Sequence, residues 1–297
     1  MSISIIGCGT LGKITANLFL KEGIKVKIIL RNPETVKDLQ EKGAEIIQGD
    51  VNSENSLHEA CKDAEVILTA VHGMLGKGKN ASKRIDDEAH CRLINIAKEA
   101  GVHQFIYTSA SGASPNHPID FWKTKYKVEQ CLIASGLNYT IIRPSAFMET
   151  HMHFLIGKPL LEKGKVNLFG KGEASTNFIS AADVAQINFL IYKNEEYYNT
   201  IIELGGPDNL SRNEVVNLYE KHSGKKAKVT RLPLTVVKTL STLIKPFHEG
   251  ISRIMKVGFI GETVETAMDT SFTIKRFGLE PTSAEEFIKD QVSSHLR

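Results

Sequence analysis

Three glycines near the start of the chain have the spacing of a phosphate-binding turn. Gly7, Gly9 and Gly12 form the pattern Gly-x-Gly-x-x-Gly, between a short apolar run and a segment, residues 13–20, that is typical of a helix. In such a turn the first glycine permits the bend, the second lets the backbone approach a diphosphate, and the third lets the helix pack closely on the strand. The dipole of that helix favours negative charge. The residues expected to hold a dinucleotide here are Gly7, Gly9, Thr10, Leu11 and Gly12. The alternative is an ordinary strand-to-helix turn that happens to contain three glycines.

The residue after the second predicted strand, residues 25–30, indicates which dinucleotide is bound. The end of this strand faces the adenosine ribose in dinucleotide-binding folds. An acid there accepts a hydrogen bond from a free 2′-hydroxyl, whereas a base pairs with a 2′-phosphate. This chain has Arg31 followed by Asn32, and no acid. Because a guanidinium suits a phosphate dianion, the sequence favours NADP, with NAD less favoured. The alternative is that Arg31 is only a surface residue at the end of a strand.

Two further segments are expected to line the nucleotide. Asp50, followed by Val51, comes after a short third strand and could accept a hydrogen bond from the adenine amino group. The alternative is a turn-forming role for Asp50 after Gly49. The other segment follows a continuous apolar run, residues 64–71, that is typical of a central parallel strand. It opens a loop rich in glycine and lysine with Val71, His72 and Gly73.

Alternating strands and helices position these residues. Runs typical of strands end at glycine, asparagine or proline, and segments typical of helices lie between them. The predicted strands are residues 2–6, 25–30, 45–47, 64–71, 104–109 and 139–143. This alternation predicts βαβ units and an α/β fold with a doubly wound parallel sheet. After Pro144 the strands become short and the helices irregular. We therefore expect a nucleotide-binding domain over 1–145 and a smaller α+β substrate lobe over 146–297, with segments of the lobe returning to the sheet.

The bulk composition excludes several classes of protein. The chain has 297 residues, and its 37 basic and 34 acidic side chains give a net charge of +3. This balance calls for no nucleic acid or membrane partner. The cysteines have no Cys-x-x-Cys spacing, and His151-x-His153 has no third ligand nearby, so no metal site is expected. With no long apolar run and no leader before the first strand, the sequence predicts a cytoplasmic protein.

The chain resembles the NmrA-like group of atypical short-chain dehydrogenases/reductases. The motifs that carry the resemblance are residues 6–12, 30–33, 49–51, 100–109, 135–144 and 178–185. They span nearly the whole chain and are specific for the superfamily but not for a substrate. The resemblance implies a Rossmann-type domain that binds NAD(P). It also implies that Phe147 and Met148, which follow the sixth strand, line the nicotinamide end of the substrate cleft; the alternative for both is core packing.

The same resemblance identifies Lys125, four residues before Glu129, as the lysine of the site. Short-chain reductases usually place a tyrosine four residues before this lysine, and the tyrosine gives its proton to a carbonyl. Here that position is Phe121, and Tyr126 would point about 100° away from Lys125 on a helix. Two functions follow. One is NADPH-dependent reduction of a small, electron-poor, quinone-like acceptor, in which Lys125 or water handles the proton and Ser109 hydrogen-bonds the substrate. The other is a non-catalytic NADP-binding redox sensor that regulates a protein partner.

Overall fold

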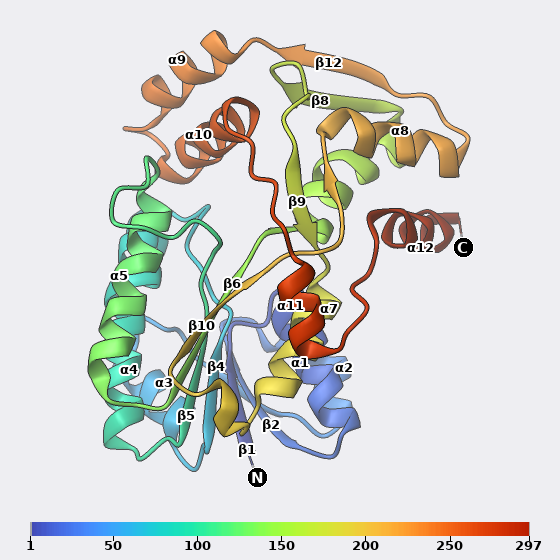
Figure 1. The fold of residues 1–297 in the computed structure, drawn as a ribbon. Helices are drawn as coiled ribbons and strands as arrows, with labels where there is room; N and C mark the ends of the chain where they lie inside the picture. Colours follow the sequence, from blue (N-terminus) through green and yellow to red (C-terminus); the bar gives the residue numbers. More distant parts are fainter. Residues whose placement is uncertain (1, 297) are drawn as a thin grey trace. The chain divides into compact units, whose positions relative to one another are not determined.

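The computed structural model describes residues 2–296 and contains a seven-stranded sheet in the order β10-β6-β5-β4-β1-β2-β3 (Figure 1). Its strands are β1 (Ser2–Ile6), β2 (Lys25–Leu30), β3 (Glu45–Gln48), β4 (Val66–Thr69), β5 (Gln104–Thr108), β6 (Tyr139–Pro144) and β10 (Thr200–Leu204). Strands β1 to β6 pair in parallel. The chain runs outward from β1 to β2 and β3, then returns to the other side of β1 for β4. Doubly wound sheets bind ligands at such a reversal, at the carboxyl ends of the strands on either side of it, here β1 and β4. The predicted doubly wound sheet is confirmed.

Helices cover both faces of this sheet (Figure 1). The helices are α1 (Thr10–Lys21), α2 (Lys37–Glu41), α3 (Glu54–Cys61), α4 (Ala89–Glu99), α5 (Asp120–Ser135) and α7 (Ala181–Ile191). On one face, Leu57 of α3, Leu93 of α4 and Leu132 of α5 belong to a single buried apolar cluster with strand residues. On the other face, Phe19 of α1 makes an edge-on ring contact with Phe189 of α7. Both faces are therefore apolar cores, as the continuous apolar runs of the parallel strands require.

Two of the segments between strands are not continuous α-helices. The segment after β2 is a 3₁₀ turn, Pro33–Val36, followed by α2. The segment before β5 begins with a π-helical turn over Lys83–Glu88 that continues into α4. Such π-helical turns often occur at functional sites. Here the turn carries Asp86, a fully buried carboxylate.

The chain divides into two compact units, Met1–Arg143 with Val184–Glu203, and Pro144–Asp183 with Leu204–Arg297. The second unit contains a three-stranded sheet, β11-β9-β7, and a two-stranded sheet, β12-β8. The strands are β7 (Ala146–Phe147), β8 (Lys165–Phe169), β9 (Thr176–Ile179), β11 (Asn209–Leu210) and β12 (Lys228–Leu232). The helices are the π-helical η4 (Glu149–Gly157), α6 (Lys158–Lys163), α8 (Arg212–Ser223), α9 (Leu234–Ile244), α10 (Glu249–Thr263), α11 (Ser271–Phe277) and α12 (Ala284–Leu296). Its own core includes Met148, Phe178 and Tyr219.

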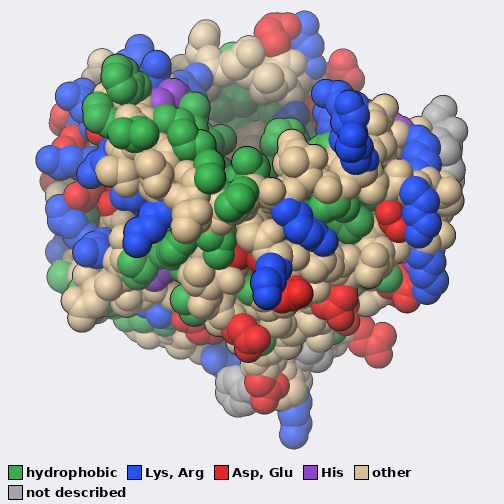
Figure 2. Space-filling view, turned by 90° about the horizontal axis from the view of Figure 1, so that it is seen from above, with side chains coloured by type: hydrophobic (Ala, Val, Ile, Leu, Met, Phe, Trp, Pro, Cys, Tyr) green, Lys and Arg blue, Asp and Glu red, His purple; other side chains and the backbone are tan. Residues whose placement is uncertain are grey.

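Helices α9 and α10 present apolar side chains to the surface of the second unit. Figure 2 shows hydrophobic side chains gathered over these two helices, with Lys and Arg side chains beside them. The exposed apolar residues here are Val236, Leu240, Leu243, Phe247 and Ile251. Within residues 2–296, no helix combines the length and the apolar character that crossing a membrane would require.

The segment Val184–Glu203 is joined to β5 through the buried side chain of Gln104. The Gln104 amide nitrogen donates to the Ile191 carbonyl at 2.9 Å, and its oxygen accepts from the Lys193 backbone N–H at 2.8 Å. The same amide nitrogen also contacts the Thr140 hydroxyl at 3.3 Å. One fully buried amide therefore satisfies both backbone groups at the point where α7 ends.

Replacing Gln104 by methionine keeps the volume of the side chain but leaves the Lys193 N–H unpaired, whereas the Ile191 carbonyl keeps its bond from the Asn194 N–H at 3.2 Å. An unsatisfied buried group costs about 1–3 kcal/mol, so the Gln104→Met variant should lose about 1–3 kcal/mol of unfolding free energy. Urea unfolding followed by circular dichroism measures this loss. Gln40→Met, at an exposed position of α2, is the control and should change stability by less than about 0.5 kcal/mol. Equal effects of the two substitutions would contradict the role given to Gln104.

Candidate functional site

The glycine turn between β1 and α1 has three glycines with three different surroundings. Gly7 has φ +91°, and a Cβ added there would lie 2.6 Å from the Cβ of Val71. A Cβ on Gly12 would lie 2.2 Å from the Gly7 carbonyl oxygen. A Cβ on Gly9 would meet no atom within 4 Å. Gly7 and Gly12 are therefore required by the packing of the protein itself, whereas the space beside Gly9 is open.

The N-terminus of α1 is suited to an anion. Gly9 is the N-cap residue, and no side chain caps the helix there. The first N–H groups of a helix lack partners within the helix, and together with the helix dipole they attract negative charge. An open space beside Gly9, in front of an uncapped helix of twelve residues, has the geometry that a dinucleotide diphosphate needs.

Arg31 lies at the end of β2 and is exposed. Its Nη1 donates to the side-chain oxygen of Asn80 at 2.9 Å, so the structure brings Arg31 next to the loop that starts at Val71. Among the residues that the structure describes, no carboxylate forms an ion pair with Arg31. The guanidinium is therefore available to an anion at the point where a 2′-phosphate is expected.

Asp50 forms a turn in the structure. Its Oδ1 accepts from the backbone N–H of Asn52 at 2.9 Å and from the side-chain amide of Asn52 at 3.0 Å. Val51 is half-buried and packs against the apolar cluster of α3, α4 and α5. Asp50 therefore has the turn-forming role that the sequence left as the alternative. A contact of Asp50 with adenine stays a prediction.

The loop after β4 is held in place by Asp86. Asp86 Oδ2 accepts from the Gly73 backbone N–H at 3.0 Å and from the Ser82 hydroxyl at 2.6 Å. Gly73 is buried, and a Cβ there would lie 2.9 Å from the Asn80 carbonyl oxygen. His72, between Val71 and Gly73, is exposed. The two ends of this loop are thus tied to one buried carboxylate.

Lys125 is buried on the inner face of α5, with 3% of its surface exposed. Its Nζ donates to the Thr108 carbonyl at 3.0 Å and lies 3.9 Å from Asp86 Oδ1. The ammonium also lies over the rings of Tyr107 and Phe121, at 4.9 and 5.5 Å from their centroids. Burial lowers the pKa of Lys125, and the negative charge of Asp86 opposes that shift. A buried lysine with a lowered pKa releases its proton more readily than an exposed one, which is useful for proton transfer.

Ser109 is buried at the carboxyl end of β5 and donates its hydroxyl hydrogen to Glu129. Glu129 is fully buried and accepts two further hydrogen bonds from Arg143, at 2.9 Å from Nε and 2.5 Å from Nη2. Arg143 also bonds Glu203 at 3.0 Å. The hydroxyl hydrogen of Ser109 is therefore committed to Glu129, and what it offers a ligand is its oxygen lone pairs.

His90 of α4 completes the buried polar groups around Lys125. Its Nδ1 lies 2.6 Å from the Ile85 carbonyl and its Nε2 lies 2.8 Å from the Thr69 hydroxyl. Because a carbonyl only accepts, Nδ1 carries the hydrogen and Nε2 accepts from Thr69. Burial, followed by the charge of Lys125, lowers the pKa of His90 to about 4, so the imidazole is neutral near pH 7.

No hydroxyl lies where the usual reductase tyrosine would be. Phe121 occupies that position on α5, and its ring makes an edge-on contact with Trp122. Tyr107 lies closer to Lys125, but its hydroxyl is buried and has no hydrogen-bond partner within the described residues. Burial also raises the pKa of Tyr107 well above its usual value. Neither Phe121 nor Tyr107, the two aromatic residues next to Lys125 Nζ, therefore offers an accessible proton.

The sequence-predicted residues fall into two sets. Those of the first unit follow the carboxyl ends of β1 to β5 or lie on α5. Gly7 lies against Val71, Arg31 bonds Asn80, and Asp86 contacts both Gly73 and Lys125. Phe147 and Met148 lie in the second unit, where Phe147 is half-buried in β7 and Met148 is fully buried in the core. Their role in a substrate pocket stays a prediction.

The sequence reasoning missed Asp86 and the roles of Glu129 and Arg143. Asp86 lies between the predicted strands 64–71 and 104–109, and acidic residues near the start of a helix are common for electrostatic reasons alone. Glu129 entered only as a spacing marker for Lys125. One signal could have indicated a buried charged site here. Lys125 and Glu129 are two charged residues one helical turn apart, on the same, buried face of α5.

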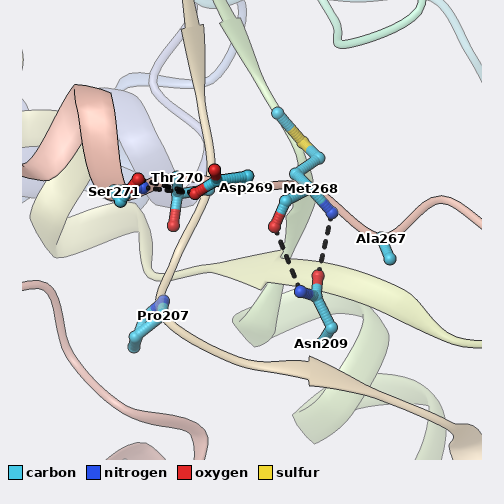
Figure 3. A pocket seen from close by; sticks show the side chains of 7 residues that line it. All are labelled: Pro207, Asn209, Ala267, Met268, Asp269, Thr270 and Ser271. Carbon is cyan, nitrogen blue, oxygen red and sulfur yellow. Dashed lines mark hydrogen bonds between the residues drawn. The ribbon is translucent and has the colours of Figure 1, made fainter.

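A separate pocket of about 560 Å³ lies in the second unit (Figure 3). Asn209 and Met268 close one side of it through two hydrogen bonds, at 3.1 Å from the Asn209 amide to the Met268 carbonyl and 3.0 Å from the Met268 N–H to the Asn209 oxygen. Its remaining lining residues are Pro207, Ala267, Asp269, Thr270 and Ser271. None of the predicted site residues lines this pocket.

The different surroundings of Gly9 and Gly12 give a matched pair of substitutions. Gly9→Ala adds a methyl group to open space at an ordinary backbone φ of −74°, so it should leave the unfolding temperature nearly unchanged. It should weaken NADPH binding at least tenfold, because the methyl group occupies the space assigned to the diphosphate. Gly12→Ala forces a clash and should cost about 1–3 kcal/mol of stability. Calorimetric titration and thermal unfolding measure both effects. A Gly9→Ala variant that binds NADPH as tightly as the wild type would refute the assignment.

Comparison with known proteins places the chain in a family. The NmrA-like family matches residues 2–288. A photosystem II assembly factor Ycf39 from Guillardia theta is 28% identical over all of this chain and 96% of its own length. An NAD(P)H azoreductase from Xenophilus azovorans is 22% identical over 82% of this chain and 80% of its own. The structure of the NADPH-dependent quinone oxidoreductase QOR2 from Escherichia coli, in complex with NADPH, has a TM-score of 0.76 at 23% identity, covering 99% of this chain and all of that one. The similarity to the quinone oxidoreductase structure concerns the fold alone. The family match over residues 2–288 shows that this chain belongs to the NmrA-like family.

Proposed function

We propose that this protein binds NADP(H) and reduces a small, electron-poor organic acceptor such as a quinone. The observations that carry the proposal are the open, uncapped turn at Gly9 and the exposed guanidinium of Arg31, which bonds Asn80 but has no carboxylate partner within the described residues. The quinone oxidoreductase and the azoreductase among the similar proteins support the reaction class, since both are named for reducing electron-poor acceptors.

The residues around Lys125 fit such a reaction better than the reduction of a simple ketone. Bound NADPH supplies a hydride, and the reduced quinone takes up a proton in addition. A quinone needs little help from a strong acid, because the product oxyanion is stabilised by its own ring. Lys125 Nζ, with its lowered pKa, provides a positive charge and a transferable proton, and solvent then restores that proton. The missing hydroxyl at Phe121 is compatible with this chemistry.

A second candidate function is a nucleotide-binding regulator without turnover. It is favoured by Phe121, which removes the usual proton donor, and by Ser109, whose hydrogen is committed to Glu129. The similarity to proteins named as assembly factors supports a role in binding a protein partner. A regulator of this kind would bind NADP and NADPH with different affinities and would bind its partner in only one of the two states.

Turnover separates the two candidates. Purified protein should oxidise NADPH when menadione is added, and Lys125→Met should lower kcat by about 100-fold, within the range of general acid catalysis. The control is Lys127→Met, which removes a solvent-exposed lysine of the same helix whose Nζ lies 2.7 Å from Asp87. Loss of nicotinamide absorbance measures the rate. Tight NADPH binding without turnover of quinones, azo dyes or carbonyls would exclude the reductase and leave the regulator.

The choice of cofactor depends on Arg31. Arg31→Ala should weaken NADPH binding at least tenfold and NADH binding less than threefold, because a charge-assisted contact to the 2′-phosphate is worth about 1.5–3 kcal/mol. Lys37→Ala, which removes an exposed lysine paired with Glu34, serves as the control. Equal losses for the two nucleotides would show that Arg31 does not select the 2′-phosphate.

A further inference from the structure

Arg212, the first residue of α8, is a buried cation without a hydrogen-bonded partner. Its Nη1 atom is inaccessible to solvent and forms no hydrogen bond with any described residue. Arg212 as a whole residue is half-buried, so part of it is exposed to solvent. Buried polar groups in proteins are nearly always satisfied, and one that is not needs an explanation.

The guanidinium is held in place by an aromatic ring. Its central carbon lies 5.1 Å from the centroid of Phe178, a fully buried residue of β9. A guanidinium above a ring gains cation–π attraction through its face. The N–H donors of a guanidinium lie in its own plane, and the contact with Phe178 therefore leaves them available.

The nearest acid does not neutralise Arg212. Glu262 of α10 attracts the guanidinium through space, but among the described residues no carboxylate lies within ion-pair distance of Arg212. Glu262 Oε2 instead accepts from the Gly172 backbone N–H at 2.8 Å. Burial raises the pKa of Glu262, and the charge of Arg212 opposes this shift. The carboxylate is thus engaged elsewhere and leaves the donors of Arg212 unused.

His151 of η4 adds a neutral polar group near the cation. Burial, reinforced by the charge of Arg212, lowers the pKa of His151 to about 3. Its imidazole is therefore uncharged near pH 7 and adds no second positive charge. The unused donors of the Arg212 guanidinium, which lies over the Phe178 ring, suit a carboxylate ligand.

We propose that Arg212 forms a binding site in the second unit for the carboxylate of a small organic ligand. A carboxylate would satisfy the donors of Arg212 through two parallel hydrogen bonds, the geometry for which the guanidinium is preorganised. In the reductase proposed above, such a site would select acceptors that carry a carboxylate. The binding site itself does not depend on that reaction, because it can be measured without turnover.

Binding of benzoate, compared with its uncharged analogue benzamide, tests the proposal. Calorimetric titration of the full chain should show saturable binding of benzoate and at least tenfold weaker binding of benzamide. Arg212→Met should weaken benzoate binding at least tenfold, and Arg212→Lys should weaken it less. Glu262→Gln should strengthen it, because the amide oxygen can still accept from Gly172 while the competing negative charge is gone.

Thermal unfolding separates a ligand-binding arginine from a structural one. Because Arg212 has no hydrogen-bonded partner within the described residues, and methionine can still pack on Phe178, Arg212→Met should unfold at about the same temperature as the wild type. Arg231→Met, which removes a bond of 3.1 Å to Asn213, is the control and should leave benzoate binding unchanged. Absence of benzoate binding to the wild type, or equal binding to Arg212→Met, would overturn the proposal. Loss of quinone turnover alone would bear on the reductase and not on this site.

Discussion

The buried carboxylate of Asp86 is the interaction on which the rest of the candidate site depends. It holds both ends of the loop after β4 through Gly73 and Ser82, and its other oxygen faces Lys125 at 3.9 Å. That oxygen has no hydrogen bond within the described part of the chain. A buried pair of charges is expensive to desolvate, and removing one partner leaves the other uncompensated. Lys125 and the loop after β4 are therefore coupled through Asp86. Removing the charge of either Lys125 or Asp86 leaves the remaining charge buried without its partner.

A second charged group, Glu129 with Arg143, fixes the neighbouring side of the site. Glu129 accepts a hydrogen bond from the Ser109 hydroxyl, which leaves only the oxygen lone pairs of Ser109 for a ligand. Arg143 holds Glu129 in place through its own hydrogen bonds. The two buried carboxylates, Asp86 and Glu129, both raise the pKa of Lys125 against the stronger effect of burial. The ammonium is thus stabilised by two separate anions while it remains shielded from water. This arrangement is consistent with a lysine that holds a charge and can release a proton.

Much of the fold could be predicted from the sequence because its signals are local. The apolar run before Gly7 predicts the end of β1, and the glycine spacing predicts the turn. The open space beside Gly9 was predictable for the same reason, since close backbone approach needs an absent side chain. The π-helical turn at Lys83–Glu88 was not predictable. It carries Asp86, whose carboxylate accepts from Gly73, thirteen residues away, and such a long-range bond leaves no local signal.

The long-range pairings of the site could not be predicted. Nothing in the local pattern distinguishes the buried Lys125 from the exposed Lys127, because both lie among charged residues on one helix. The difference arises from β5, which brings Tyr107 and the Thr108 carbonyl against one side of α5. Arg212 is a similar case, since its stacking on Phe178 joins elements far apart in the chain.

The turn at Gly9 and the guanidinium at Arg31 are proposed to form a site for NADPH together. A side-by-side calorimetric titration of the wild-type protein with NADPH and with NADH tests this proposal. We expect saturable binding of a single NADPH per chain and clearly weaker binding of NADH. Absence of saturable binding for either nucleotide, or tighter binding of NADH, would contradict it.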